Sequence, residues 1–332
     1  MSNSRRHLLC LLSLVVGLSA ASAARASSIE PESILDAIIW IEHHSGLVHS
    51  ARGDFTVHYL PTSQEDMRRI NALCRYRGHE YRAAGYFISQ RQANRRSYYA
   101  AWWRAGVKER QEKTHIARPA IVETTVFDGS VVKTLDGTPG RSCLYLTSPE
   151  ANWMHKSRIE PFAFAFEYRS DPHADILRGS TQRRLTWQRH GEEDRYVVHA
   201  RHPRDEHLEL RLEYDEEHRL IARDVILRDA SSWMETDDSE PAVFSRWEFS
   251  NFRSYGDGQG NQVWFPSSAM LRYYLGALPD GSLVQSYALQ VDVGDIEFNA
   301  DIPDSRFALQ PPEGVPVRDL RDGGNAALGV SY

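Results

Sequence analysis

Long uncharged apolar segments are absent from this 332-residue sequence. The apolar run at residues 8–20 is shorter than the roughly 18 to 20 residues that a membrane-spanning helix needs, and no later segment reaches that length. Arg5 and Arg6 precede this run, and small residues with two Ala-x-Ala patterns follow it. We therefore expect residues 1–26 to be a signal peptide. The mature protein would be soluble, exported and periplasmic, by the general secretory or the twin-arginine route.

Cysteine is scarce, with three in the whole chain, and Cys10 lies inside the expected signal peptide. The other two, Cys74 and Cys143, could form a disulfide in an oxidising compartment or could remain two buried thiols. Their spacing alone does not choose between these two states.

An excess of positive charge is also lacking, because the formal net charge is -6. Removal of residues 1–26 takes away three arginines and no acids, which brings the charge to -9. Nucleic acids and anionic membrane surfaces need a cationic binding surface. The sequence therefore argues against both as main partners.

Recognised catalytic signatures are missing as well. The sequence has no G-x-S-x-G, H-E-x-x-H or phosphate-binding loop motif. The glycine-rich run at residues 256–260 lies between predicted strands and lacks a following helix, so we interpret it as a hairpin tip. We predict no enzymatic activity and no cofactor.

Histidines gather around one predicted hairpin, which carries His199, His202 and His207. A zinc site needs three or four converging ligands, and His199 and His207 could face each other across the two strands. Such a site would permit a metal-dependent hydrolase. Histidines on the surface of a hairpin explain the same pattern without a metal, and we predict no metal site.

Two segments have the pattern of helices. In residues 31–45, apolar side chains recur at helical spacing after Pro31 and Glu32. In residues 63–77, a capping-box pattern at Ser63 to Asp66 precedes a second apolar stripe.

From about residue 81 the apolar period becomes two, which indicates strands. Tyr99, Trp103 and Val107 lie on one face of a predicted long strand, and Asp128-Gly129 is a turn signal between two further strands. Residues 148–170 break the alternation, and we expect irregular or helical packing there, over one mouth of the sheet.

The closing run, residues 263–319, predicts a hairpin with its turn at residues 279–281. Apolar residues alternate as far as Val293 and then continue at Ile296 and Phe298, an odd step. One extra residue re-aims every later side chain, so the pattern predicts a bulge at Gly294.

Together these elements predict one α+β domain at residues 27–319, with a polar, disordered tail at 320–332. We expect a strongly curved antiparallel sheet, a half-barrel, with helices covering its concave face. Without such a cover, the apolar face would exceed the exposed patch that soluble monomers tolerate.

The chain resembles the Lol-type (LolA- and LolB-like) periplasmic lipoprotein carriers, and especially their uncharacterised exported bacterial members. The resemblance covers most of residues 81–319, and its sharpest parts are Phe127-Asp128-Gly129 and the run with Phe307, Leu309, Pro312 and Gly314. It implies an antiparallel half-barrel whose apolar cavity receives acyl chains. The chain is longer than a typical carrier, and these matching residues are turn and strand-end positions.

Our first functional hypothesis is a soluble carrier that holds a hydrophobic ligand, an acyl chain or the lipid of a lipoprotein. The alternative is a non-catalytic envelope protein that fills its own cavity and binds an envelope partner. A metal-dependent hydrolase is third. Strand parity selects the candidate ligand-binding residues, which are Tyr99, Trp103, Val126, Trp247, Phe249, Leu271, Tyr273, Leu289 and Val291.

Overall fold

A computed structural model describes residues 33–77, 96–104, 108–115, 122–137, 140–148, 173–190, 193–203, 206–228, 241–256 and 260–321. The expected signal peptide lies outside these residues. So do the insert predicted at 148–170, apart from its first residue, and the tail predicted at 320–332, apart from its first two.

The two predicted helices are confirmed, as α2 (Ile34–Gly46) and α3 (Gln64–Arg77). Each begins with the same side-chain arrangement. The Ser33 hydroxyl accepts the Asp36 N–H, and the Asp36 carboxylate accepts from Ser33 in return. Ser63 and Asp66 repeat this exchange at α3. The exchange satisfies backbone donors that a helix start otherwise leaves without partners.

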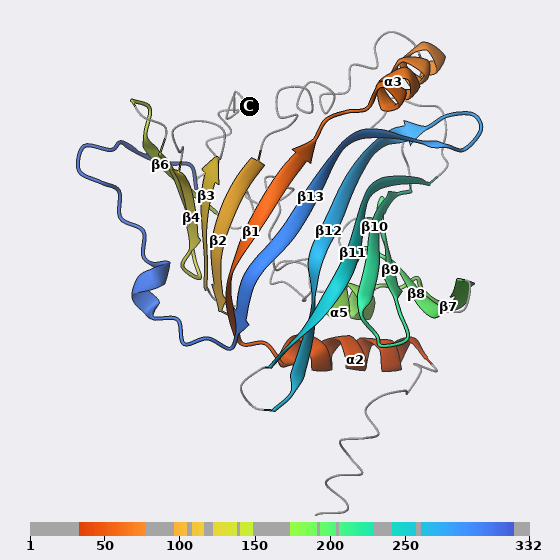
Figure 1. Cartoon of the computed structure of the whole chain (residues 1–332), viewed down its shortest axis with the longest axis horizontal. Helices are drawn as coiled ribbons and strands as arrows, with labels where there is room; N and C mark the ends of the chain where they lie inside the picture. The colour runs from red at the N-terminus through yellow and green to blue at the C-terminus, as the bar shows by residue number, and fades with distance from the viewer. Residues whose placement is uncertain are drawn as a thin grey trace, which may run out of the picture.

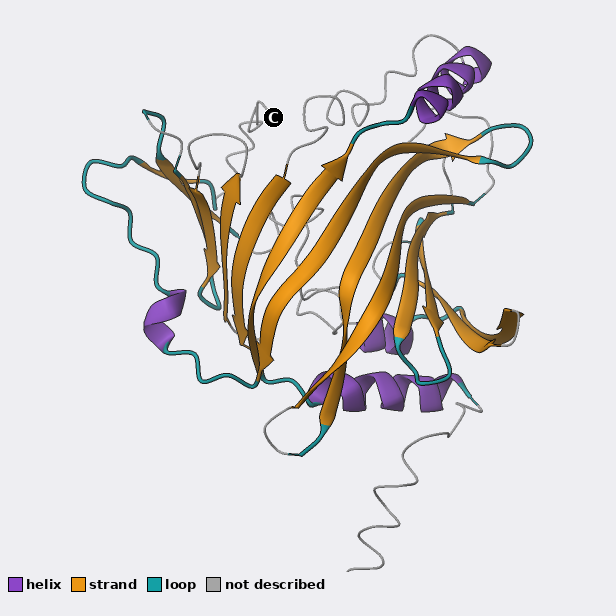
Figure 2. Cartoon of the chain, viewed as in Figure 1, coloured by secondary structure: helices purple, strands orange, loops and turns teal. Residues whose placement is uncertain are grey.

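Fourteen strands form one sheet (Figure 2). Their bounds, in chain order, are β1 (Ser50–Leu60), β2 (Arg96–Arg104), β3 (Lys108–His115), β4 (Val122–Phe127), β5 (Val132–Asp136), β6 (Cys143–Thr147), β7 (Arg183–His190), β8 (Glu193–Arg201), β9 (Leu208–Tyr214), β10 (Leu220–Leu227), β11 (Ala242–Gly256), β12 (Gln262–Ala277), β13 (Leu283–Phe298) and β14 (Val317–Asp319). Two short helices complete the described elements, α5 (His173–Gly179) and the 3-10 helix η2 (Asp304–Phe307).

The strand order is β14-β6-β5-β4-β3-β2-β1-β13-β12-β11-β10-β9-β8-β7. The chain therefore starts at the middle of the sheet, builds one wing outward and then returns inward from the opposite edge. The pairing of β1 with β13 joins the two wings. The sheet is curled and not closed (Figure 1).

The predicted fold class is wrong in two respects. The sheet is mixed, because β14 pairs with β6 in parallel, whereas we expected only antiparallel pairs. The described helices also do not cover the concave face. Figure 1 shows α2 along the lower ends of the strands and α3 beyond their upper ends.

Helix length explains why α2 does not provide this cover. A helix of 13 residues such as α2 is about 20 Å long, whereas fourteen strands about 4.8 Å apart span about 60 Å. From its position, α2 contributes Ile38 and Ile41 to the main core, and α5 contributes Ile176 and Leu177. In α3, Ile70 and Leu73 pack instead on the β12–β13 hairpin. Among the described residues, no helix has both the length and the apolar character needed to cross a membrane.

The long strand predicted from residue 98 to residue 108 is also wrong. The structure divides it into β2, which ends at Arg104, and β3, which begins at Lys108 and returns antiparallel to it. The residues between the two strands continue the period of two, so strand parity alone gave no sign of the reversal.

The bulge predicted at Gly294 is confirmed. Gly53 pairs with Ile296 and Phe55 pairs with Val293, so Asp54 of β1 stands opposite two residues of β13, Gly294 and Asp295. As a result both Val291 and Phe298 reach the main core, although an uninterrupted strand would turn them to opposite faces.

We expect Gly53→Ala to destabilise the protein at this bulge. A Cβ atom on Gly53 would lie 2.9 Å from the Asp295 carbonyl oxygen and 3.2 Å from the Ile296 Cα, so the backbone must move. The expected loss is about 1–3 kcal/mol of unfolding free energy. The control is Gly256→Ala in β11, where a Cβ atom meets nothing within 4 Å, and this change should be neutral or stabilise by about 0.4–1 kcal/mol. Chemical denaturation measures both, and equal effects would contradict the expectation.

The part of the family resemblance that contains Phe307 and Leu309 packs on the outer face of the sheet. Ile302 and Phe307 pack with Val126 in a cluster of their own, and the Arg306 guanidinium lies 3.6 Å from the centroid of the Trp102 ring. Burial acts to raise the pKa of the Asp128 carboxyl, but bonds from Lys133, Ser130 and Val131 hold that pKa far below its usual range. The motif therefore stabilises a turn and a chain segment that packs on the sheet.

Cys143 at the start of β6 is a buried free thiol. Of the two states that the sequence left open, the structure has the one in which Cys143 is not in a disulfide.

Candidate functional site

The inner face of the sheet carries the main apolar core. Register places Arg223, Trp247, Leu271, Leu289 and Tyr59 side by side on five successive strands, from β10 through β11, β12 and β13 to β1. Side chains directly opposite on neighbouring strands share one face of a sheet. The inner face is the one that also receives the apolar side chains of α2 and α5.

Eight of the nine candidate residues lie on this face. The fully packed members of the core are Tyr99, Trp103, Phe249, Leu271, Leu289 and Val291, and the half-buried members are Trp247 and Tyr273. The structure therefore brings together residues from β2, β11, β12 and β13, although up to about 190 residues of chain separate them.

Val126 is the exception, because it lies on the outer face. Val126 pairs with Arg110, which pairs with Trp102, whereas Trp103 on the inner face pairs with Glu109 and through it with Phe127. Strand parity separates Val126 from Phe127, but it does not tell which of the two shares a face with Trp103. Sequence reasoning therefore chose Val126 and missed Phe127.

A group of half-buried rings occupies one part of the inner face. We call it the inner aromatic cluster and define it as Tyr59, Phe244, Trp247, Tyr273 and Tyr287. The rings of Tyr273 and Tyr287 stack with centroids 4.6 Å apart, and Phe244 meets Tyr273 edge-on at 5.6 Å. Burial raises the pKa of the Tyr273 hydroxyl, so this hydroxyl stays neutral at physiological pH. The cluster is an uncharged, partly accessible surface.

The sequence pointed to only two of these five rings. Tyr287 alternates with Leu289 and Val291 in the closing hairpin but is not among the selected candidates. Tyr59 lies on a strand whose pairing with that hairpin the sequence did not reveal.

Phe244 lies an odd step from Trp247 on the same strand, so alternation places the two on opposite faces. A register shift between β10 and β11, across residues 243–245, accompanies the contact of Phe244 with Tyr273. Alternation alone does not show this shift. It also did not reveal that β1, β11, β12 and β13 are adjacent.

One positive charge lies beside this cluster. Arg223 is the strand neighbour of Trp247, and its charge acts on both Tyr273 and His173. His173, the first residue of α5, is buried. Burial, together with the nearby Arg223, lowers the pKa of the His173 imidazole to about 3. His173 is therefore neutral at physiological pH.

The other wing of the inner face is polar. Gln111, Thr125, Thr134 and Tyr145 are successive strand neighbours across β3, β4, β5 and β6. The hydroxyls of Thr125 and Thr134 lie 3.3 Å apart. The inner surface thus changes from apolar to polar between β2 and β3.

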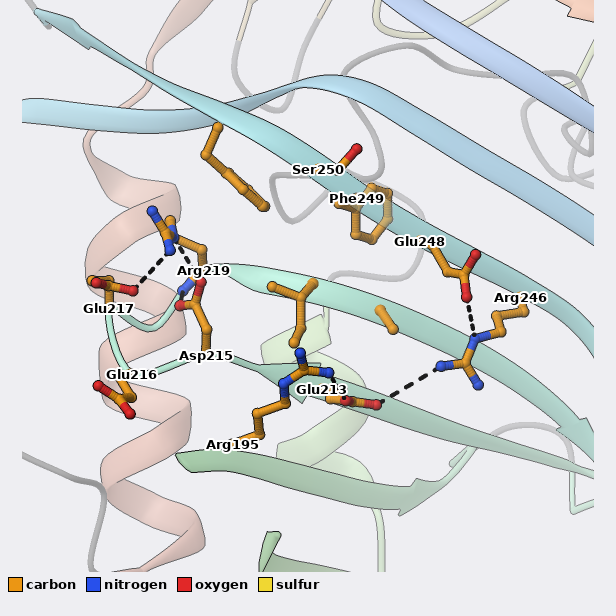
Figure 3. Close-up of a pocket in the computed structure, with 13 residues that line it drawn as sticks. Arg195, Glu213, Asp215, Glu216, Glu217, Arg219, Arg246, Glu248, Phe249 and Ser250 are labelled. Carbon is orange, nitrogen blue, oxygen red and sulfur yellow. Dashed lines mark hydrogen bonds and ion pairs between the residues drawn. The ribbon is translucent and has the colours of Figure 1, made fainter. Parts of the chain in front are cut away.

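A pocket of about 550 Å³ opens beside the β9–β10 turn, and its walls are mostly charged (Figure 3). Figure 3 shows two groups of ion pairs in it. In one, Arg219 binds Asp215 at 2.7 Å and Glu217 at 2.8 Å. In the other, Glu213 accepts from Arg195 at 3.1 Å, and Arg246 lies 3.2 Å from Glu248.

The same ion-pair network continues under the pocket on the outer face of the sheet. Asp224 is almost fully buried, and its Oδ2 lies 3.0 Å from Arg211 and 3.4 Å from Arg246. Burial raises the pKa of the Asp224 carboxyl, and the two arginines act against this shift. Because its buried acids are already bound to arginines, we interpret the network as structural. Sequence reasoning missed it, since its members lie on four strands.

The histidine group does not form the hairpin pair that the sequence permitted. His199 pairs with Arg211 across the strands, and its Nδ1 lies 3.1 Å from a carboxylate oxygen of Glu209. Within the described part of the chain, no group of three or more His, Cys, Asp or Glu side chains is placed to hold a metal ion.

Comparison with known proteins gives structural likenesses only. No family model matches the chain, and no curated protein matches it. Among solved structures, the chain is similar to a domain from Vibrio parahaemolyticus named for outer-membrane lipoprotein sorting. The identity is 8%, 83% of this chain and 97% of that chain are covered, and the TM-score is 0.44. The resemblance to lipoprotein carriers is thus found again among solved structures.

Two further likenesses are weaker. The MucA/MucB complex of Pseudomonas aeruginosa matches at 11% identity over 80% of this chain and 100% of that chain, with a TM-score of 0.24. A beta-barrel-like protein of unknown function from Brucella abortus matches at 7% identity over 76% of this chain and 99% of that chain, with a TM-score of 0.21. TM-scores below 0.5 carry no argument about function, so the function is argued from the site.

Proposed function

We propose that the protein is an exported, non-catalytic binding protein of the periplasm that holds a hydrophobic ligand against the inner face of its curved sheet. The ligand would be an acyl chain, either free or as the lipid of a lipoprotein. The inner aromatic cluster is the observation that carries this proposal. Its rings are half-buried on a wall that is otherwise apolar, and the sheet curls around that wall.

Apolar burial is sufficient to drive such binding. Each Å² of apolar surface removed from water contributes about 25 cal/mol, so an acyl chain that covers the cluster gains several kcal/mol without a charged contact. Flat, rigid rings such as Trp247 and Tyr287 offer a large contact area and lose little conformational entropy on binding. The protein would therefore act by sheltering its ligand from water.

A second candidate function has an observation in its favour. Phe55, Val57 and Val291 on the inner face are completely buried by the chain itself. A face that the chain fills by itself would leave no room for a guest, and the protein would then be an envelope interaction protein. The two candidates differ in whether a lipid binds.

The test measures lipid binding directly. Native mass spectrometry of the purified protein should detect a bound lipid, and the delipidated protein should take up a fluorescent long-chain fatty acid saturably. The double variant Trp247→Ala/Tyr287→Ala should weaken this uptake at least about tenfold, or roughly 1.4 kcal/mol. The control is Tyr98→Ala, because Tyr98 is exposed and lies beside Thr56 on the outer face; it should bind as the parent does.

Two outcomes would refute ligand binding. One is a lipid-free protein that takes up no fatty acid. The other is equal uptake by the parent and by a Trp247→Ala/Tyr287→Ala variant whose circular dichroism is unchanged. The first result combined with capture of an envelope protein would favour the second candidate function.

A further inference from the structure

The sheet ends in two different edges. At one end β14 has three residues, which is too short for a peptide to pair along it stably. At the other end β7 has eight residues and pairs with β8 alone among the described strands. A long open edge presents backbone N–H and C=O groups to a further strand.

The hydrogen bonds next to β7 show which of its backbone groups face outward. Arg201 donates its N–H to the carbonyl oxygen of Gln182, the residue before β7, at 3.0 Å. In an antiparallel pair, hydrogen-bonded and non-hydrogen-bonded residues alternate. The backbone groups of Arg183, Leu185, Trp187 and Arg189 therefore point away from β8, toward the open edge.

The side chains of β7 have a distinct chemistry. The strand contains three arginines and no acid, in a chain whose net charge is -6. Arg184 and Arg189 are exposed, and Trp187 is 44% exposed although its ring lies 5.4 Å from that of the buried Tyr196. The edge therefore combines positive charge with one accessible aromatic ring.

Further arginines surround the beginning of β7. Arg183 donates to the Leu177 carbonyl at the end of α5, and Arg228 donates to the side chain of Gln182 at 3.0 Å. Arg201 stands opposite Gln182, and the Arg201 guanidinium lies 3.9 Å from the Glu206 carboxylate. These contacts gather positive charge at one end of the open strand.

We propose that β7 is a docking strand for an extended acidic peptide segment of a partner protein, which adds to the sheet as a fifteenth strand. The outward backbone groups of residues 183, 185, 187 and 189 bind the peptide backbone, as in other cases of strand addition. Arg184 lies on one face of the sheet, and Trp187 and Arg189 lie on the other. Acidic side chains of the peptide lie on the face of Arg184, and an apolar one covers Trp187. This surface is separate from the inner aromatic cluster and does not depend on it.

The same features disfavour a second copy of this chain as the occupant. If two β7 strands paired antiparallel about Thr186, Arg183 of each copy would stand opposite Arg189 of the other. Like charges directly opposite each other destabilise a strand pair. Arginine on an edge strand also opposes edge-to-edge pairing between copies of the same protein. An acidic peptide is attracted to these arginines and not repelled by them.

The experiment measures binding of fluorescent eight-residue peptides to the full chain by anisotropy. The peptide that alternates glutamate with valine or tyrosine should bind, and more weakly as salt increases, because the attraction is electrostatic. The peptide with lysine in place of glutamate should not bind. The acidic peptide with methylated backbone nitrogens should also fail, because it cannot donate to the β7 carbonyls.

Variants locate the site on β7. Arg184→Glu/Arg189→Glu should weaken binding at least about tenfold, whereas Arg253→Glu/Arg318→Glu, which changes the net charge equally on β11 and β14, should not. Trp187→Pro should bind at least about tenfold more weakly than Trp187→Ala, because it also loses an outward N–H and no ladder bond to β8. The two variants of each pair should have the same thermal unfolding midpoint, so that a difference in binding does not reflect a difference in stability.

Each opposite result would overturn the proposal. Equal binding of the acidic and lysine peptides excludes charge selection. Equal binding by Trp187→Pro and Trp187→Ala excludes backbone pairing at this edge. A dimer in sedimentation that Arg184→Glu/Arg189→Glu strengthens would make a second copy the occupant. Because lipid binding does not enter this test, its outcome is distinguishable from that of the proposed function.

Discussion

Replacement of Tyr196 by alanine should lower the free energy of unfolding by about 4 kcal/mol, which is typical of a buried aromatic side chain reduced to a methyl group. Tyr196 in β8 is 1% exposed. Its ring stacks on Tyr214 with centroids 4.9 Å apart, and its hydroxyl lies 3.2 Å from Nδ1 of His218 in the β9–β10 turn. The cavity would open where three parts of the fold meet: the edge strands, this turn, and Trp40 of α2, which packs on His218.

The matched variant Tyr196→Phe keeps the ring and removes only the hydroxyl. It should cost about 1 kcal/mol, the usual contribution of one hydrogen bond. Burial raises the pKa of the Tyr196 hydroxyl far above its usual range, so no ionisation complicates the comparison at neutral or mildly alkaline pH. Denaturation in urea gives both values. A loss below about 2 kcal/mol for the alanine variant would mean that the site collapses and is not part of the rigid core.

A change from pH 7 to pH 5 should destabilise the protein by about 2 kcal/mol through His173 alone. The folded-state pKa of this imidazole is about 3, against an ordinary value of 6.5. Because the folded-state pKa is the lower one, the contribution is complete above pH 6.5 and is lost as the pH falls toward 3. Each pH unit in this window costs about 1.4 kcal/mol.

Comparison of two variants isolates this effect from other titrating groups. His173→Gln cannot be protonated, so its unfolding free energy should fall about 2 kcal/mol less than that of the parent between pH 7 and pH 5. His207→Gln, which alters an exposed histidine, should follow the parent. For each protein, the quantity compared is the change in unfolding free energy between pH 7 and pH 5. The absolute free energies are not compared, because the change to glutamine also affects packing. Parallel pH profiles for all three proteins would show that His173 is accessible to water.

Short-range features of this fold were predictable. The turn at residues 279–281 joins β12 to β13, and Asp280 accepts the Ser282 N–H at 2.9 Å within it. The helix start at Ser63 follows from side chains three residues apart, and the bulge at Gly294 follows from a parity change within one strand. Each of these signals depends on residues close together in sequence, so one segment contains all the information.

Features that join distant segments were not predictable in the same way. A helical cover was predicted because an uncovered apolar face of this size would be unusually large. A helix of 13 residues, however, spans only part of such a sheet. The parallel pairing of β14 with β6 joins residues about 170 positions apart. For the candidate site, eight of the nine residues selected by strand parity lie on the inner face of the structure. Four further inner-face residues were not selected: Phe127, Tyr59, Phe244 and Tyr287.

The sequence by itself determined the local elements of this protein: two capped helices, many alternating strands, and the glycine that lets one strand change face. It did so because backbone conformation and side-chain period are properties of neighbouring residues. Only the tertiary structure decided which strands became neighbours, and with that the inner aromatic cluster, the charged network on the outer face and the open edge at β7. Pairing depends on contacts across as many as 250 residues, such as that between His49 and Asn299, and no short pattern carries that information.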